Sequence, residues 1–163
     1  MDAKKSKMLI VGLGNPILGD DGVGWKVAEE VKRQLSSSQA PSRSTPVEPL
    51  LGEGGQEVDV ECFSLGGISL MEHLIGYDSA ILIDAFALDE PLGSILVLKL
   101  SDLPNYSAFH TTSTHDTSLQ NAIELGRSMG AKLPDDVSVV GIATKHVYDF
   151  SETLSPPIAE AVP

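Results

Sequence analysis

Two adjacent carboxylates stand in a glycine-rich turn near the start of the chain, where residues 12–24 read GLGNPILGDDGVG. The turn follows a short apolar run at residues 8–12, which is typical of a buried strand. Valines at helical spacing follow over residues 21–35. The motif is therefore a strand-to-helix turn that carries Asp20 and Asp21, side chains suited to a cation.

Two phosphate-binding motifs also place a glycine-rich turn after a strand, and neither fits this sequence. The dinucleotide fingerprint requires a third glycine three residues after the second, where this chain has Ile17. A P-loop requires Gly-Lys-Ser/Thr, which the sequence lacks. Paired aspartates would also repel a pyrophosphate. We therefore expect that neither NAD nor ATP binds.

Two further segments contribute side chains that bind metals. Asp84 follows the apolar run AILI, so its carboxylate must reach solvent or a partner to offset the cost of its desolvation. His115 lies in STHDTS, and His110 is so near in sequence that spacing does not choose between them. Asp21, Asp84 and a histidine would suit a borderline ion such as zinc or nickel, with positions left open for hydrolysis.

Each of these residues also has a structural interpretation. Asp20 and Asp21 could bind the free N–H groups and offset the dipole of the following helix, for about 1 kcal/mol. One aspartate suffices for that role, so the second is surplus unless it points elsewhere. Asp84 could cap the next loop, and His115 could simply start a helix. The residues alone leave these alternatives open.

Strands and helices alternate along the sequence, which predicts an α/β fold. The predicted strands are 8–12, 58–64, 80–86, 93–100 and 137–143, and the predicted helices are 21–35, 68–77, 113–130 and one that starts at Ser155. We expect a three-layer αβα sandwich with a mainly parallel, twisted central sheet and room for one antiparallel edge strand. The strand at residues 93–100 could lie at an edge. Ligands of such sheets bind at the carboxyl ends of the strands, where Asp21, Asp84 and His115 all fall.

Length and composition restrict the classes of protein. The 163 residues fit a single domain, 1–163. The net charge of −12 opposes binding to nucleic acid or an anionic membrane. Cys62 is the only cysteine, which excludes an intrachain disulfide and is compatible with the cytoplasm. Residues 36–57 are rich in Ser, Pro and Gly without an apolar period, which predicts a flexible surface loop.

The sequence resembles the hydrogenase maturation endopeptidases, peptidase family M52, which trim the C-terminal extension from the large-subunit precursor of nickel-iron hydrogenases. The most specific match is VGLGNPILGDDGVG at 11–24. FSLGGISLMEHL, AILIDAF, STHDTSL, VVGIA and LSPP then follow in the family's order. The resemblance implies that Asp21, Asp84 and His115 contact the metal, and it selects His115 over His110.

The resemblance also implies the chemistry and the partner. The expected activity is metal-assisted amide hydrolysis by an endopeptidase, with nickel supplied by the precursor and no organic cofactor. Asn15, Gly66 and Gly67 are expected to bind substrate, although the two glycines could equally form an ordinary tight turn. A non-catalytic checkpoint module that senses nickel without cutting would use the same ligands. We expect a cytoplasmic monomer.

Three features depart from the family's pattern. The loop at 36–57 is longer than the usual link. Asp21 is one methylene shorter than the Glu found in some relatives. The family continues a C-terminal helix where this sequence stops at Pro163, so a truncated end, with part of a sheet face uncovered, is an expectation.

Overall fold

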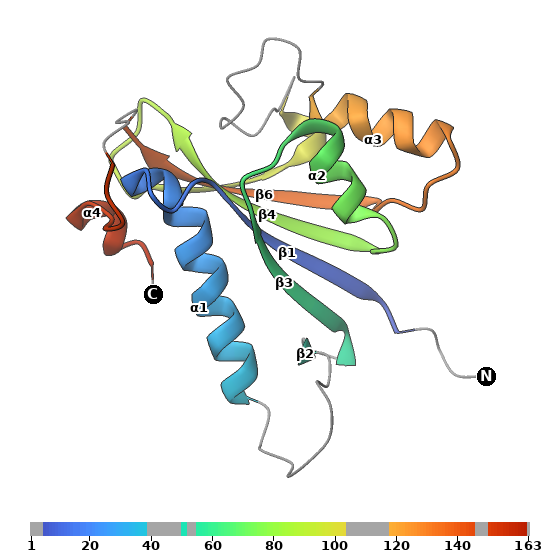
Figure 1. Cartoon of the computed structure of the whole chain (residues 1–163), viewed down its shortest axis with the longest axis horizontal. Coiled ribbons are helices and arrows are strands. Elements are labelled where there is room, and N and C mark those ends of the chain that lie inside the picture. Colours follow the sequence, from blue (N-terminus) through green and yellow to red (C-terminus); the bar gives the residue numbers. More distant parts are fainter. Residues whose placement is uncertain (1–4, 39–49, 52–54, 104–117, 146–149, 163) are drawn as a thin grey trace.

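The computed structural model describes residues 5–38, 50–51, 55–103, 118–145 and 150–162. Within them, six strands form one sheet in the order β2-β3-β1-β4-β6-β5 (Figure 1). The strands are β1 (Lys7–Leu13), β2 (Leu50–Leu51), β3 (Glu57–Phe63), β4 (Ser79–Ala87), β5 (Ile95–Lys99) and β6 (Asp136–Thr144). The helices are α1 (Val23–Ser38), α2 (Gly67–Leu74), α3 (Leu119–Ser128) and α4 (Pro156–Ala159), with short 3-10 turns η1 (Gly19–Gly22) and η3 (Leu100–Asp102).

The sheet is mainly parallel, as predicted. β1 pairs in parallel with β3 and β4, and β4 pairs in parallel with β6. β2 and β5 are antiparallel to their neighbours and occupy the two edges. The α/β sandwich and an antiparallel edge strand are therefore confirmed, and the strand predicted at residues 93–100 is the one at that edge, β5.

Helices cover both faces of the sheet, and each face has its own apolar core. α2 and α3 pack on one face, around Leu82 and Val139, and α1 and α4 pack on the other, around Ile83 and Ile142 (Figure 1). Side chains alternate between faces along a strand, so the continuous apolar runs of β4 and β6 supply both cores at once. These runs are the reason the central strands were predictable.

The predicted loop at 36–57 is wrong at both of its ends. Residues 36–38 complete α1, where the hydroxyls of Ser36, Ser37 and Ser38 donate to carbonyl oxygens three or four residues earlier. Residues 50–51 form β2, and Glu57 already belongs to β3. The middle of the predicted loop, residues 39–49 and 52–54, lies outside the described residues.

Two predicted helices are shorter than their patterns suggested. α3 begins at Leu119, and the hydroxyl of Ser118 accepts from the Asn121 N–H as its N-cap. Ser118 therefore starts the helix that was predicted to start at residue 113, and residues 113–117 lie outside the described part of the chain. α2 ends at Leu74 because Ile75 is extended and Gly76 has a φ of 94°.

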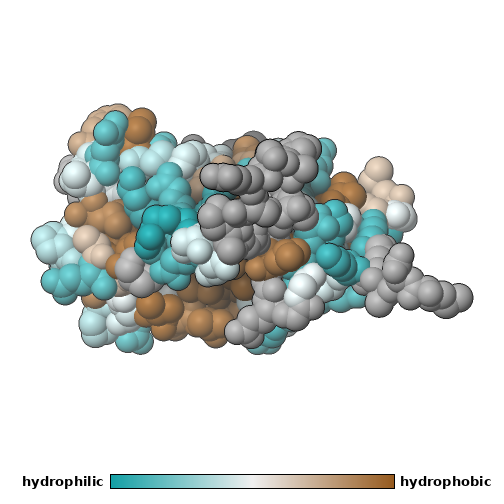
Figure 2. Space-filling view, turned by 90° about the horizontal axis from the view of Figure 1, so that it is seen from below, coloured by the Kyte–Doolittle hydropathy of each residue, from teal (hydrophilic) through white to brown (hydrophobic). Residues whose placement is uncertain are grey.

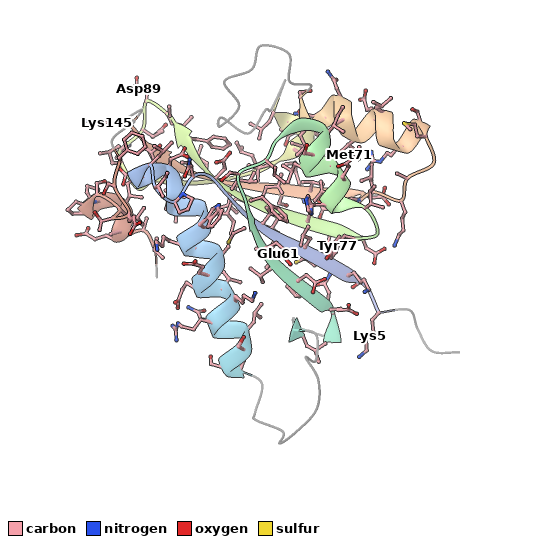
Figure 3. The ribbon with its side chains drawn as sticks, viewed as in Figure 1. Lys5, Glu61, Met71, Tyr77, Asp89 and Lys145 are labelled. Atoms are coloured by element: carbon pink, nitrogen blue, oxygen red, sulfur yellow. The ribbon has the colours of Figure 1, made fainter. Side chains whose placement is uncertain are left out.

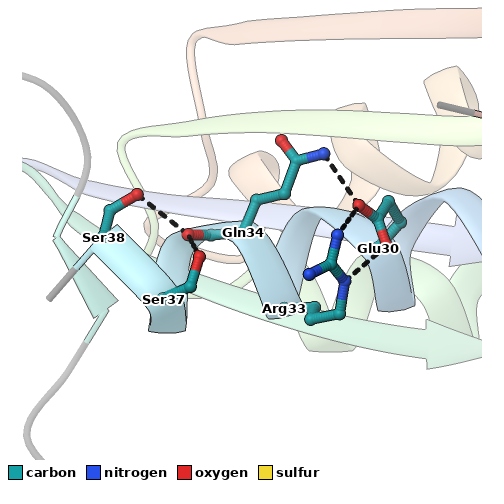
Figure 4. A network of polar contacts seen from close by, with 5 residues as sticks. All are labelled: Glu30, Arg33, Gln34, Ser37 and Ser38. Atoms are coloured by element: carbon teal, nitrogen blue, oxygen red, sulfur yellow. Dashed lines mark hydrogen bonds and ion pairs between the residues drawn. The ribbon is translucent and has the colours of Figure 1, made fainter.

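The exposed face of α1 carries a polar network with a measurable pH dependence (Figure 4). Arg33 donates two hydrogen bonds to Glu30, from Nε at 2.8 Å and from a terminal nitrogen at 2.5 Å, and the Gln34 amide adds a third at 2.8 Å. The Arg33 bonds, followed by the Gln34 bond, lower the pKa of Glu30 from 4.5 to about 2. The stabilisation from this lowered pKa is present above pH 4.5 and is lost as the pH falls through about 2.

We expect the substitution Arg33→Gln to raise the pKa of Glu30 toward its ordinary value of 4.5, because the largest stabilising contact of the carboxylate is lost. A carboxyl NMR titration measures this pKa directly. Arg127→Gln, on α3, serves as the control and should leave the Glu30 titration unchanged. A Glu30 pKa that stays near 2 in Arg33→Gln would contradict this reading of the network.

Some apolar surface stays exposed on the described part of the chain. Ile95 and Val97 of β5 are 57% and 68% exposed. They stand opposite Ile142 and Val140 in the ladder, and therefore on the α1–α4 face. Figure 2 shows apolar side chains gathered on part of the surface between polar ones. No helix among the described residues is both long and apolar enough to cross a membrane.

Candidate functional site

The parallel strands end at one edge of the sheet, and the turn after β1 with Asp21 and the later part of β4 with Asp84 lie at this edge. Asp89 follows β4 and Lys145 follows β6, and Figure 3 labels both at this edge. Lys5, before β1, is labelled at the opposite end of the molecule (Figure 3). The chain passes from β1 through α1 to β3, which lies on one side of β1, and then from β3 through α2 to β4, which lies on the other side of β1. The direction of the connections therefore reverses between β1 and β4, and this reversal is the topological switch point of the sheet. Ligands of open α/β sheets bind at such a point.

The turn after β1 depends on a glycine at position 14. Gly14 has a φ of 131°, and a Cβ there would lie 1.9 Å from the carbonyl oxygen of Asp21. The Gly14 N–H donates to the Phe63 carbonyl at 3.2 Å, and the Ser64 hydroxyl donates to the Gly14 carbonyl at 2.5 Å. Gly14 therefore lets the turn fold back on the segment of η1 that holds Asp21, while the end of β3 holds the turn from the other side.

Asp21 is oriented by the same turn. Its Oδ2 accepts a hydrogen bond of 2.8 Å from the backbone N–H of Asn15. The Asn15 side chain accepts from the Ile17 N–H at 3.2 Å, which is an Asx turn. Asn15, predicted to bind substrate, thus has a structural role that the sequence analysis missed, and its contact with substrate stays a prediction.

Asp84 is fully buried, with 0% of its surface exposed. The prediction that it ends its strand is wrong, because β4 continues to Ala87 and pairs with β6 throughout. β1, however, pairs with β4 only as far as Ile83. Asp84 is therefore the first residue of β4 beyond its β1 partner. Its Oδ1 accepts from the Ala85 N–H at 2.9 Å.

The surroundings of Asp84 are apolar on its own face. Alternation places it between Leu82 and Phe86, both members of the α2–α3 core. The Phe86 ring covers Gly141, the residue paired with Asp84, because a Cβ on Gly141 would lie 2.0 Å from that ring. A carboxylate buried in such surroundings costs several kcal/mol unless charge or hydrogen bonds compensate it.

Close backbone packing brings the Asp21 segment against the Asp84 strand. A Cβ on Gly24, in the first turn of α1, would lie 2.3 Å from the carbonyl oxygens of both Leu13 and Ile83. η1, which holds Asp21, contacts β4 directly. The structure thus places Asp21 and Asp84 on the two sides of the switch point.

Asp20 and Asp21 both lie in η1, the 3-10 turn immediately before α1, so acidic residues stand at the N-terminal end of the helical segment as the structural interpretation expected. Asp21 accepts its hydrogen bond from the Asn15 N–H, in the turn before η1. Asp20 instead accepts two hydrogen bonds from Ser155, which is the N-cap of α4 as predicted. Sequence reasoning found no partner for Asp20, although it noted that one of two adjacent aspartates was surplus.

Gly66 and Gly67 form the turn into α2. Gly66 is extended and is the N-cap residue, and its carbonyl oxygen accepts from the Leu70 N–H at 3.2 Å. Gly67 is buried and has a φ of 51°, which an L side chain rarely adopts. The two glycines therefore form the tight turn that was one of the two interpretations, and their binding of substrate stays a prediction.

The remaining predicted ligand, His115, lies outside the described residues, as does His110. Within residues 5–38, 50–51, 55–103, 118–145 and 150–162, no three His, Cys, Asp or Glu side chains converge as metal ligands. The described part of the chain places Asp21 and Asp84, and the role of all three residues as metal ligands stays a prediction.

Cys62 is a poor candidate for a nucleophile. It is half-buried in β3, packs against the α1–α4 core, and donates weakly from its Sγ to the Trp25 carbonyl at 3.9 Å. Burial raises the pKa of its thiol, and the nearby Glu29 raises it further. A thiol with a raised pKa is mostly protonated and unreactive at neutral pH.

Curated relatives match nearly the whole chain at low identity. The hydrogenase expression/formation protein HupD of Rhodobacter capsulatus is 23% identical over 96% of this chain and 66% of its own length. HupM of Azotobacter chroococcum is 25% identical over 97% of this chain and 67% of its own length. The chain thus spans about two thirds of the length of these relatives.

Solved structures share the fold. The hydrogenase maturating endopeptidase HybD of Escherichia coli superposes with a TM-score of 0.64 at 19% identity, over 96% of this chain and 85% of that one. The maturation protease HycI of Thermococcus kodakarensis superposes with a TM-score of 0.60 at 20% identity, over 98% and 87%. Residues 62–163, more than half of the chain, match the family described as hydrogenase maturation protease. The chain therefore belongs to the hydrogenase maturation protease family.

Proposed function

We propose that this protein is an endopeptidase that removes the C-terminal extension of a nickel-iron hydrogenase large-subunit precursor after nickel has been inserted. Membership of the family supports the reaction class. The observation that carries the proposal is the placement of a fully buried Asp84 and an oriented Asp21 on the two sides of the switch point. Two carboxylates at this place suit a cation carried by the substrate.

Nickel enters this reaction as part of the substrate. Asp21, Asp84 and His115 would contact the nickel of the precursor, and the scissile bond would lie beside it. The metal would polarise the scissile carbonyl or activate a water, which is the usual part of a Lewis acid in amide hydrolysis. The contribution of this chain is to hold its carboxylates in fixed directions: the Asn15 N–H orients Asp21 and the Ala85 N–H orients Asp84.

The partner and setting follow from the same proposal. The client is a hydrogenase large-subunit precursor, and the enzyme acts as a monomer in the cytoplasm without contact to nucleic acid or membrane. The net charge of −12 supports the last point, because it repels both surfaces. Asn15, Gly66 and Gly67 would lie beside the substrate chain at the edge of the sheet.

Mass spectrometry of the precursor tests this function. Purified nickel-loaded precursor incubated with the protein should lose one fixed C-terminal peptide, and nickel-free precursor should keep its full mass. The rival function, a checkpoint module that binds without cutting, predicts an unchanged mass together with nickel-dependent binding. Binding and no cleavage would therefore reject the endopeptidase in favour of the checkpoint.

A further inference from the structure

The turn that holds Asp21 is bound by a segment far along the chain. The Ser155 N–H donates to Asp20 Oδ1 at 2.6 Å, and the Ser155 hydroxyl donates to Asp20 Oδ2 at 2.8 Å. The two residues are 135 positions apart. Both oxygens of Asp20 are thus occupied by one residue, and hydrogen bonds to a charged acceptor are stronger than neutral ones.

Backbone hydrogen bonds join the same two segments. The Gly19 N–H donates to the Ser151 carbonyl at 2.6 Å, and the Ser151 N–H donates to the Ile17 carbonyl at 3.0 Å. Leu18 and Ser151 form a parallel bridge. The turn at residues 17–20 is therefore held by residues 151–155 on one side, as Gly14 is held by the end of β3 on the other.

Asp20 and Asp21 are consecutive residues in η1, so the direction of one restricts the direction of the other. Asp20 is turned toward Ser155, whereas Asp21 is turned toward the Asn15 N–H. Without the Ser155 contact, the backbone bonds to Ser151 would still hold residues 17–19, but the Asp20–Asp21 peptide would be less restricted and the bond from Asn15 to Asp21 would weaken. A displacement of about 1 Å at a reacting centre can slow a reaction roughly 100-fold.

We infer that Asp20 is a positioning residue: held by Ser155, its carboxylate fixes η1 so that Asp21 keeps the direction in which it meets the substrate. This inference rests on the proposed function for Asp21. Asp20 acts through geometry and not through its charge. The presence of Asp20 beside Asp21 is therefore explained by its contact with Ser155.

Three variants separate geometry from charge. Asp20→Ala removes both contacts, and we expect the cleavage rate at saturating nickel-loaded precursor to fall about 10- to 100-fold with KM little changed. Asp20→Asn should stay within about threefold of wild type, because the amide oxygen accepts from the Ser155 N–H and the amide nitrogen donates to the hydroxyl. Glu152→Ala, which removes an exposed carboxylate from the same segment, is the matched control and should behave as wild type.

Hydrogen exchange supplies a second readout that needs no activity. The Asn15 amide is protected by its bond to Asp21, so its exchange should quicken about 10-fold in Asp20→Ala and stay unchanged in Asp20→Asn. The Leu82 amide, in buried β4, should exchange at the wild-type rate in every variant, which distinguishes local rotation from global loss of stability.

The outcomes separate the two hypotheses. If wild-type protein leaves the precursor intact, the proposed function fails, and Asn15 exchange still decides whether Asp20 positions Asp21. Unchanged Asn15 exchange in Asp20→Ala overturns the inference. Cleavage as slow in Asp20→Asn as in Asp20→Ala, with Asn15 exchange normal in the Asn variant, also overturns it, because Asp20 would then act through its charge.

Discussion

Replacing Asp21 or Asp84 by Asn is expected to slow cleavage of nickel-loaded precursor by at least roughly 10³-fold, with little change in thermal stability. An amide is a much weaker ligand for a divalent ion than a carboxylate. Asp84→Asn keeps the oxygen that accepts from the Ala85 N–H, so the strand should retain its local contact. Cleavage measured by mass spectrometry and unfolding followed by circular dichroism give the two quantities.

Non-additivity is the signature of a single metal-contacting unit. The double variant Asp21→Asn/Asp84→Asn should be little slower than either single variant, because the reaction that both residues serve is already lost. His115→Ala should be equally inactive, and His110→Ala should remain active as its control. The opposite result for the two histidines would show that the ligand assignment is wrong. Unfolding of Asp84→Asn would show that Asp84 holds a loop and not a metal.

The central strands could be predicted because the apolar residues that bury each of them are consecutive in the sequence. β1, β4 and β6 are buried on both faces, so each is a continuous apolar run that a reader of the sequence can see. β2 could not be predicted, because two leucines at the end of a Ser- and Pro-rich stretch become a strand only by pairing with β3. The last turn of α1 was missed for a related reason, since serines were counted as loop residues.

The positions of Asp21 and Asp84 in the fold could be predicted from residue type and place in the sequence, whereas their role as metal ligands stays a prediction. A carboxylate after a buried strand and another after a glycine turn indicated Asp84 and Asp21, and both lie at the switch point. The contact of Asp20 with Ser155 could not be read from the sequence, because residues 135 positions apart share no local pattern. The structural role of Asn15 was missed because the sequence does not show which backbone N–H groups of a turn need a side-chain acceptor.

Gly24→Ala is expected to destabilise the fold by about 3 kcal/mol, although helix propensity alone predicts the opposite sign. Gly24 lies in the first turn of α1, where Ala would ordinarily add up to about 1 kcal/mol of stability. The added Cβ, however, would lie 2.3 Å from the carbonyl oxygens of Leu13 and Ile83, and neither backbone can move without breaking its strand. Chemical denaturation measures the change.

Gly126→Ala, in the interior of α3, is the matched control. Its Cβ would meet the ends of two flexible side chains, Leu133 at 2.8 Å and Met71 at 2.9 Å, which can shift to accommodate it. We therefore expect a smaller loss, about 1 kcal/mol or less. Equal losses in the two variants would show that backbone contact at Gly24 is not the cause.

The contact at Gly24 also sets the geometry of the site. Gly24 follows Asp21 by three residues, and Ile83 immediately precedes Asp84, so the approach of α1 to β4 fixes how far apart the two carboxylates stand. If Gly24→Ala folds at low temperature, the added methyl group should push α1 away from β4 and so slow cleavage. Gly126→Ala should cleave at the wild-type rate. Normal cleavage by folded Gly24→Ala would mean that this packing supports the fold alone. Gly24 would then be needed for stability and not for the reaction.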